Sequence, residues 1–207
     1  WPFLYMAERT VPASYVGLAV GLAMASLVWV RRATRGSGSL DWHFFLLGSA
    51  FLLIEVKGVV ELALVWGTTW VVNTVVISGI LVFILLANWF VSAVRPRRRW
   101  PYYIGLALSL LAGAAYPVAH WLEYGWATAA VVSAVMLLIP LLFSGVIFAT
   151  SLNACASAPA ALASNLIGAI FGGFLEYWSM ALGFRAMYLL ALGLYAASFL
   201  VLRGSRR

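Results

Sequence analysis

The sequence predicts an all-α, polytopic transmembrane bundle of about seven helices, and three observations indicate it. The chain has 207 residues, of which 65% are hydrophobic and only 9% are charged, with a mean hydropathy of +1.01. A soluble domain of this size carries about 25% charged residues. Apolar runs of about 20 residues, the length that spans a bilayer core, recur along the chain. The runs are continuous rather than alternating, which favours helices over the strands of a membrane barrel.

The length of each apolar run and the residues that follow it indicate where each helix begins and ends. The first run precedes the flexible stretch Arg35-Gly-Ser-Gly-Ser, the second is framed by tryptophans, and the third precedes the stiffer Arg95-Pro-Arg-Arg-Arg. Pro140 is expected to kink the fifth helix, and Arg185 separates the sixth from the seventh. We expect one transmembrane domain, residues 1–207, with helices at 11–30, 42–66, 70–94, 101–119, 127–150, 159–182 and 186–202.

Arginines predict the orientation of the bundle, because cytoplasmic connectors of membrane proteins are rich in Lys and Arg. Only Arg9 and Arg185 fall on the opposite side, so we expect the N-terminus outside and the C-terminus in the cytoplasm of a bacterial inner membrane. The cytoplasmic arginines are Arg31, Arg32, Arg35, Arg95, Arg97, Arg98, Arg99, Arg203, Arg206 and Arg207. The tryptophans expected to anchor the helix ends at the headgroups are Trp42, Trp66, Trp70, Trp100, Trp121 and Trp126.

Charged residues inside the second apolar run are the most informative local feature. A charge at mid-bilayer costs about 2.5–3.5 kcal/mol, so such groups pair, face the protein interior or serve a pathway. At 1.5 Å per residue, they lie with three other polar residues in one layer of the outer half of the membrane. This expected polar cluster comprises Glu55, Lys57, Glu61, Asn73, Glu176 and Arg185.

Helical spacing predicts which of these charges pair. Lys57 and Glu61 are four residues apart, so they share a face. Glu55 lies about 200° away from Lys57 and needs a partner on another helix. Two interpretations stay open. The spacing favours an ion-pair network that fixes the helix register; the alternative is a functional site, either a proton or cation relay or a polar substrate cavity that opens outward. A smaller pair nearer the cytoplasm, Asn88 and Asn165, is expected to form interhelical hydrogen bonds.

Small residues spaced one turn apart predict close helix packing. Glycine at both positions of such a pair lets two helix backbones approach. One pair, Gly17 and Gly21, lies in the first expected helix, and the other, Gly168 and Gly172, lies in the sixth.

Several function classes are excluded by what the sequence lacks. The basic residues lie at the ends of apolar segments, which argues against nucleic-acid binding despite the net charge of +7. A single cysteine, Cys155, excludes an internal disulfide, and His43 and His120 are too far apart for a metal motif. Nucleophile elbow, phosphate loop, zinc and haem motifs are absent, so we expect no catalytic residue, metal or cofactor in this segment.

Two stretches of the chain resemble a known family. They run from His43 through Glu55-Val-Lys57-Gly-Val-Val-Glu61 to Asn73 and from Ala163 through Glu176 to Leu190. They resemble the membrane part of spermidine-synthase-like multi-pass proteins, in which a methyltransferase-like domain is fused to membrane helices. The resemblance implies that a soluble domain precedes Trp1 in a longer polypeptide.

Three functions follow as hypotheses. The first is a non-catalytic anchor, scaffold or accessory subunit, with the lipid bilayer and other membrane proteins as partners. The second is a transporter module for polyamines or other cations that uses the acidic layer, above all Glu55 and Glu176. The third, implied by the resemblance alone, is the membrane part of an aminopropyltransferase-like enzyme whose catalytic domain is absent here.

Overall fold

The computed structural model describes residues 40–67, 70–116 and 121–204, together with scattered residues between 13 and 28. The chain divides into two compact units, residues 1–39 and 40–207. The scattered residues of the first unit are helical, but most of the helix expected at 11–30 lies outside the described residues. So do several residues named above, which are Trp1, Arg9, Arg31, Arg32, Arg35, His120, Arg206 and Arg207.

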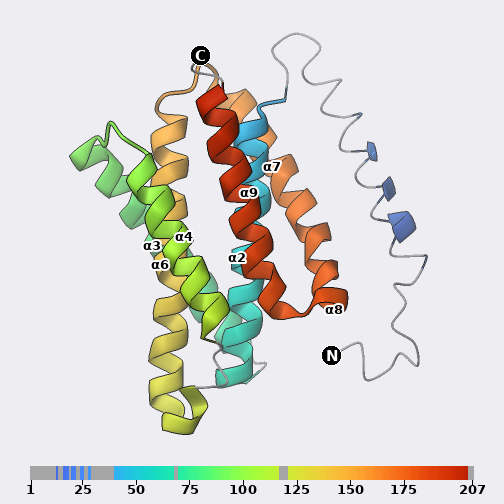
Figure 1. Ribbon diagram of the computed structural model, residues 1–207, viewed down its shortest axis with the longest axis vertical. Helices are drawn as coiled ribbons and strands as arrows, with labels where there is room; N and C mark the ends of the chain where they lie inside the picture. Colours follow the sequence, from blue (N-terminus) through green and yellow to red (C-terminus); the bar gives the residue numbers. More distant parts are fainter. Residues whose placement is uncertain are drawn as a thin grey trace. The chain divides into compact units, whose positions relative to one another are not determined.

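Every element in the described part of the second unit is a helix (Figure 1), which confirms the all-α fold class. The long helices are α2 (Trp42–Trp66), α3 (Trp70–Val94), α4 (Trp100–Ala115), α6 (Trp126–Leu152), α7 (Ala158–Leu175) and α9 (Phe184–Gly204). Three short ones connect them: η2 (Leu122–Tyr124), η3 (Glu176–Trp178) and α8 (Ser179–Leu182).

Four described segments are long and apolar enough to cross a membrane, as expected of a multi-pass membrane protein. Three of them lie within α3, α6 and α9, and the fourth runs through α7 into η3. The segments are Val76–Val94, Ala127–Leu152, Ala158–Trp178 and Arg185–Gly204. Helix α4 is apolar but shorter, at 16 residues.

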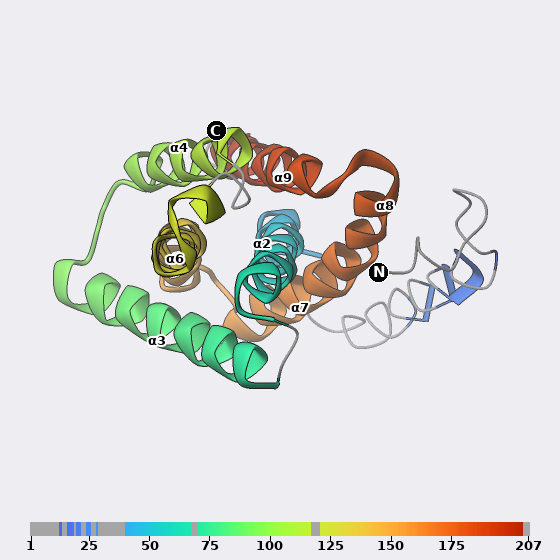
Figure 2. The ribbon, with the colours of Figure 1, turned by 90° about the horizontal axis from the view of Figure 1, so that it is seen from below.

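The charged helix α2 lies at the centre of the second unit. Seen from the end (Figure 2), α2 and α6 lie side by side inside a ring formed by α3, α4, α9 and α7, and α2 packs most extensively on α7 and α9. Its side chains dominate the core, with Phe44, Leu53 and Ile54 almost fully buried. Apart from Trp42, its described side chains are buried or half-buried, which is typical of an interior helix.

Two helix ends differ from the expected boundaries by more than two residues, each for a local reason. Helix α4 ends at Ala115 rather than at residue 119, because Pro117 disfavours helical backbone at the residue before it. Tyr116 accordingly has φ −114° and ψ 89°. The sixth expected helix is regular only to Leu175 and then continues through η3 and α8. Gly172 and Gly173, poor helix formers, lie just before this change.

Helices α2 and α7 pack with their backbones in direct contact. A Cβ atom built on Gly168 or Gly172 would overlap the backbone carbonyl of Phe45 or Ser49. Gly48 of α2 meets the backbone of α7 in the same way, at Asn165. Three glycines thus allow direct backbone contact between the two helices. Gly17 and Gly21 lie in the first unit with helical backbone, and the packing expected of them stays a prediction.

The two ends of the bundle differ in charge. The arginine-bearing end, at the top of Figure 1, is defined by Arg95, Arg97, Arg98, Arg99 and Arg203. Exposed aromatic rings lie near both ends, as in the interfacial belts of membrane proteins. They are Trp42, Trp89 and Trp100 at the arginine-bearing end and Trp70, Tyr124 and Trp178 at the opposite end.

Candidate functional site

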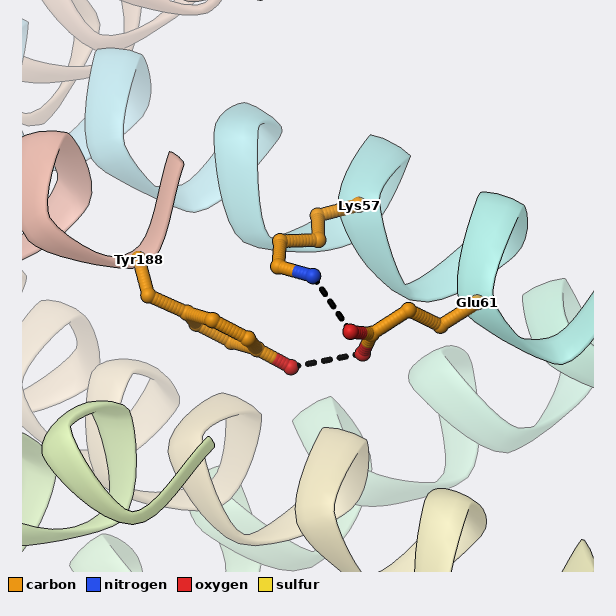
Figure 3. A network of polar contacts seen from close by, with 3 residues as sticks. All are labelled: Lys57, Glu61 and Tyr188. Carbon is orange, nitrogen blue, oxygen red and sulfur yellow. Dashed lines mark hydrogen bonds and ion pairs between the residues drawn. The ribbon is translucent and has the colours of Figure 1, made fainter. Parts of the chain in front are cut away.

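The core of the candidate site is a buried three-residue network of Lys57, Glu61 and Tyr188 (Figure 3). Lys57 is only 3% exposed, and its Nζ donates to Glu61 Oε1. The Tyr188 hydroxyl donates to the other carboxylate oxygen, Glu61 Oε2, at 2.7 Å. The Lys57 ammonium also lies 4.1 Å from the centroid of the Tyr188 ring, within cation–π range. The charges of Lys57 and Glu61 therefore compensate each other, and Tyr188 contacts both side chains.

The network joins three helices. Lys57 and Glu61 come from one face of α2, and Tyr188 comes from α9. The Tyr188 ring fits against α4 because Gly113 has no side chain there; a Cβ on Gly113 would lie 2.8 Å from Tyr188 Cζ. The arrangement holds α2, α4 and α9 in one register. Sequence reasoning did not identify Tyr188, since a single tyrosine in an apolar helix carries no signal of its partner.

The two remaining carboxylates of the expected cluster lie on the α2–α7 seam. Leu52 Cδ2 lies 3.3 Å from the Cβ position of Gly173. Glu55 and Glu176 each follow three residues later, so the register brings them to the same level. Both are half-buried, and within the described ranges neither makes an ion pair or hydrogen bond. Among the described carboxylates of the expected cluster, these two lack the partner that Glu61 has.

The structure does not gather the whole expected cluster into one site. Asn73 lies exposed on the first turn of α3. Arg185 is exposed and donates from Nη2 to the Ala115 carbonyl at 3.2 Å, which caps the C-terminal end of α4. The expected layer therefore separates into the central network, the carboxylate pair on the seam and two residues nearer the surface.

A second buried polar network surrounds His43 near the arginine-bearing end. Its Nδ1 lies 2.8 Å from Ser198 Oγ, and its Nε2 lies 2.9 Å from Ser151 Oγ. Ser198 Oγ in turn lies 3.2 Å from the Tyr103 hydroxyl. These four side chains are all buried and come from α2, α9, α6 and α4. The network is a four-helix junction, and the serines and the tyrosine in it were not predicted.

A cavity of about 170 Å³ lies deeper in the bundle, between α2, α3, α6, α7 and α9. Both residues of the smaller expected pair, Asn88 and Asn165, line it. Asn165 Nδ2 donates to the Phe44 carbonyl at 3.2 Å, an interhelical hydrogen bond from α7 to α2. Tyr195 also lines the cavity, and its fully buried hydroxyl makes no hydrogen bond of normal geometry. The neighbouring Ser144 donates its own hydrogen to the Leu141 carbonyl.

Metal chemistry has no support in the described residues, where no three His, Cys, Asp or Glu side chains could hold an ion together. The Cys155 thiol, half-buried, donates to the Leu152 carbonyl. No family model, no curated protein and no solved structure matches this chain. The resemblance to spermidine-synthase-like proteins therefore stays a prediction, and the geometry alone carries the functional argument.

Proposed function

We propose that this chain is a non-catalytic membrane module of the bacterial cytoplasmic membrane, which anchors, scaffolds or accompanies a partner. The observation that carries this is the central network. Lys57 is paired with Glu61, covered by Tyr188 and almost inaccessible to solvent. A buried cation that is paired and enclosed by three helices braces those helices; it offers no free group to a substrate.

The rest of the interior supports the same proposal. Helices α2 and α7 touch through glycines, and four helices share the hydrogen bonds around His43. Both devices fix helix positions, which suits a rigid platform better than a machine that must open. In the proposed orientation the arginine-bearing end faces the cytoplasm, in keeping with the positive-inside rule.

The test is to isolate the native protein from its own membranes in a mild detergent and to determine its mass and its companions. A scaffold or anchor is expected in a complex of defined stoichiometry, or within a longer polypeptide that carries a soluble domain. A partner-free, monodisperse protein with the mass of this chain alone would count against the proposal. An S-adenosyl-binding domain in the longer product would favour the aminopropyltransferase-like alternative.

The carboxylate pair on the seam favours one alternative, a transporter module for polyamines or other cations. Glu55 and Glu176 lie at one level, half-buried, with no cation beside them in the described part of the chain. A half-buried carboxylate without a countercharge at this depth suits a cation or a proton as its partner. If this alternative holds, Glu55→Gln and Glu176→Gln each abolish polyamine transport in a folded protein. The matched control is Glu123→Gln, at an exposed position of η2. Unchanged transport in both seam variants would end the idea.

A further inference from the structure

A cavity of about 770 Å³ opens at the arginine-bearing end, between the last turns of α3, the connector of residues 95–99 and the last turn of α6. Its polar lining includes three arginines, Arg95, Arg97 and Arg99, and the neutral side chains of Asn88, Ser92, Thr150 and Asn153. Its volume lies within the range of about 300–1,000 Å³ that is typical of small-molecule sites. We call it the arginine pocket.

The sequence builds this pocket from a helix face and a tight turn. Asn88, Ser92 and Arg95 are four and three residues apart, so they follow one face of α3. Arg95 ends the helix with φ +47°, and its N–H donates to the Val91 carbonyl at 2.9 Å. Pro96 prevents the helix from continuing. The chain then turns so that Arg97 and Arg99 face the end of α6.

Helix α6 contributes the carbonyl groups of its C-terminal end. This end is the negative end of the helix dipole and would by itself repel an anion. Arg99 offsets this, because its Nη2 donates to the Thr150 carbonyl at 3.2 Å. Asn153 N–H is bonded to the Ala149 and Ser151 carbonyls. Fewer carbonyl groups at this helix end are therefore left without a hydrogen bond. The positive charge of the guanidinium groups dominates the pocket.

Among the described residues, no acidic side chain lines the pocket to balance its charge. The chain contains only six acidic residues, five of them in the described ranges. Of those described, Asp41 is the one at this end, and its Oδ1 accepts from the backbone N–H groups of His43 and Phe44. The charge of the pocket therefore calls for an anionic ligand from outside the described residues.

We propose that the arginine pocket binds the phosphate of an anionic phospholipid headgroup. Guanidinium groups bind phosphate oxygens in pairs, and basic pockets between transmembrane helices bind anionic headgroups. The pocket lies level with the interfacial rings of Trp89 and Trp100. Its apolar lining includes Val91 and Leu152, and the exposed Leu85 precedes Asn88 by three residues on the same face of α3. A phospholipid can place its phosphate against the arginines and its acyl chain along these apolar side chains.

The experiment compares lipid adducts of the full chain by native mass spectrometry, with titrations of phosphatidylglycerol, phosphatidylcholine and soluble glycerol phosphate. The pocket variant is Arg95→Gln/Arg97→Gln. The matched control, Arg98→Gln/Arg203→Gln, removes the same charge from the same end, at positions that do not line the pocket. Thermal unfolding without added lipid verifies that both variants fold.

The proposal expects one phosphatidylglycerol per chain, bound in preference to phosphatidylcholine. The pocket variant should bind it at least tenfold more weakly, because a hydrogen bond from a guanidinium to a charged phosphate is worth about a factor of ten or more. The control variant should stay within about threefold of the wild type. Equal losses in both variants would overturn the pocket and leave only a general surface charge. Glycerol phosphate binding as tightly as the lipid would overturn the assignment to a lipid.

Discussion

At the scale of single residues, two tyrosines of α9 make a matched comparison. Tyr188 and Tyr195 are both buried, but only the Tyr188 hydroxyl has a normal hydrogen bond, to Glu61 Oε2. Tyr188→Phe should cost about 1 kcal/mol in the free energy of unfolding, the usual scale of hydrogen bonds between membrane helices. Tyr195→Phe should be neutral or slightly stabilising, because it removes a buried polar group without a partner.

The measurement is reversible unfolding of both variants in the same detergent micelles, followed by helical circular dichroism. A cost of Tyr195→Phe equal to that of Tyr188→Phe would contradict this account. It would show that the Tyr195 hydroxyl is hydrogen-bonded, for instance to a molecule in the 170 Å³ cavity that it lines.

The pairing of Lys57 with Glu61 gives a second prediction at this scale. Lys57→Met leaves the Glu61 carboxylate without its cation, and breaking one partner of a buried pair costs about 3–5 kcal/mol. Lys57→Met/Glu61→Gln should recover most of that loss, because the glutamine is neutral and its oxygen still accepts from Tyr188. The free energy of unfolding of the two single variants and the double variant forms a double-mutant cycle. Additive losses would mean that the two charges do not interact.

At the scale of elements, the α2–α7 contact depends on the absence of side chains at three glycines. Gly168→Ala and Gly172→Ala should each destabilise the protein by about 1–3 kcal/mol, because the added Cβ meets rigid backbone rather than a movable side chain. Gly193→Ala of α9 is the control: it is helical and exposed, with open space around it, and should stabilise by up to about 1 kcal/mol. Melting temperatures of the three variants compare them directly. Loss at Gly193 as large as at Gly168 would argue against the close contact.

Helix positions could be predicted from the sequence because local signals determine them. Tryptophans mark both ends of α2, and a run of apolar residues ending before Arg95 defines α3; both helices have the expected bounds. The i,i+4 spacing also suffices for the contact of Lys57 with Glu61. The end of α4 was missed only because the effect of Pro117 on Tyr116 was not weighed.

The composition of the site could not be predicted, because it depends on which faces of different helices meet. Depth along the membrane placed Asn73 and Arg185 beside the charges of α2, but depth says nothing of rotation about a helix axis. Tyr188, the partner of Glu61 on α9, is 127 residues away in the sequence. Its ring fits in the bundle because α4 has a glycine, Gly113, at that point. The His43 junction likewise joins serines that any apolar helix can carry.

At the scale of the whole molecule, the charge asymmetry of the bundle predicts its orientation. All the described arginines except Arg185 lie at one end, whereas Glu123 lies at the other. By the positive-inside rule we expect the arginine-bearing end in the cytoplasm, with the arginine pocket at the leaflet surface where anionic lipids attract basic groups.

Cysteine labelling tests this orientation with a matched pair of sites. In a Cys155→Ala background, Ala156→Cys places a thiol in the exposed connector between α6 and α7 at the arginine-bearing end, and Glu123→Cys places one at the opposite end. A membrane-impermeant maleimide should label the thiol at position 123 in spheroplasts, which keep the cytoplasmic membrane intact but lack the outer layers of the cell envelope. It should label the thiol at position 156 only after the membrane is opened. The background variant without cysteine controls for labelling elsewhere. The reverse pattern would place the arginines outside, against the positive-inside rule, and would remove the lipid surface on which the arginine pocket is proposed to act.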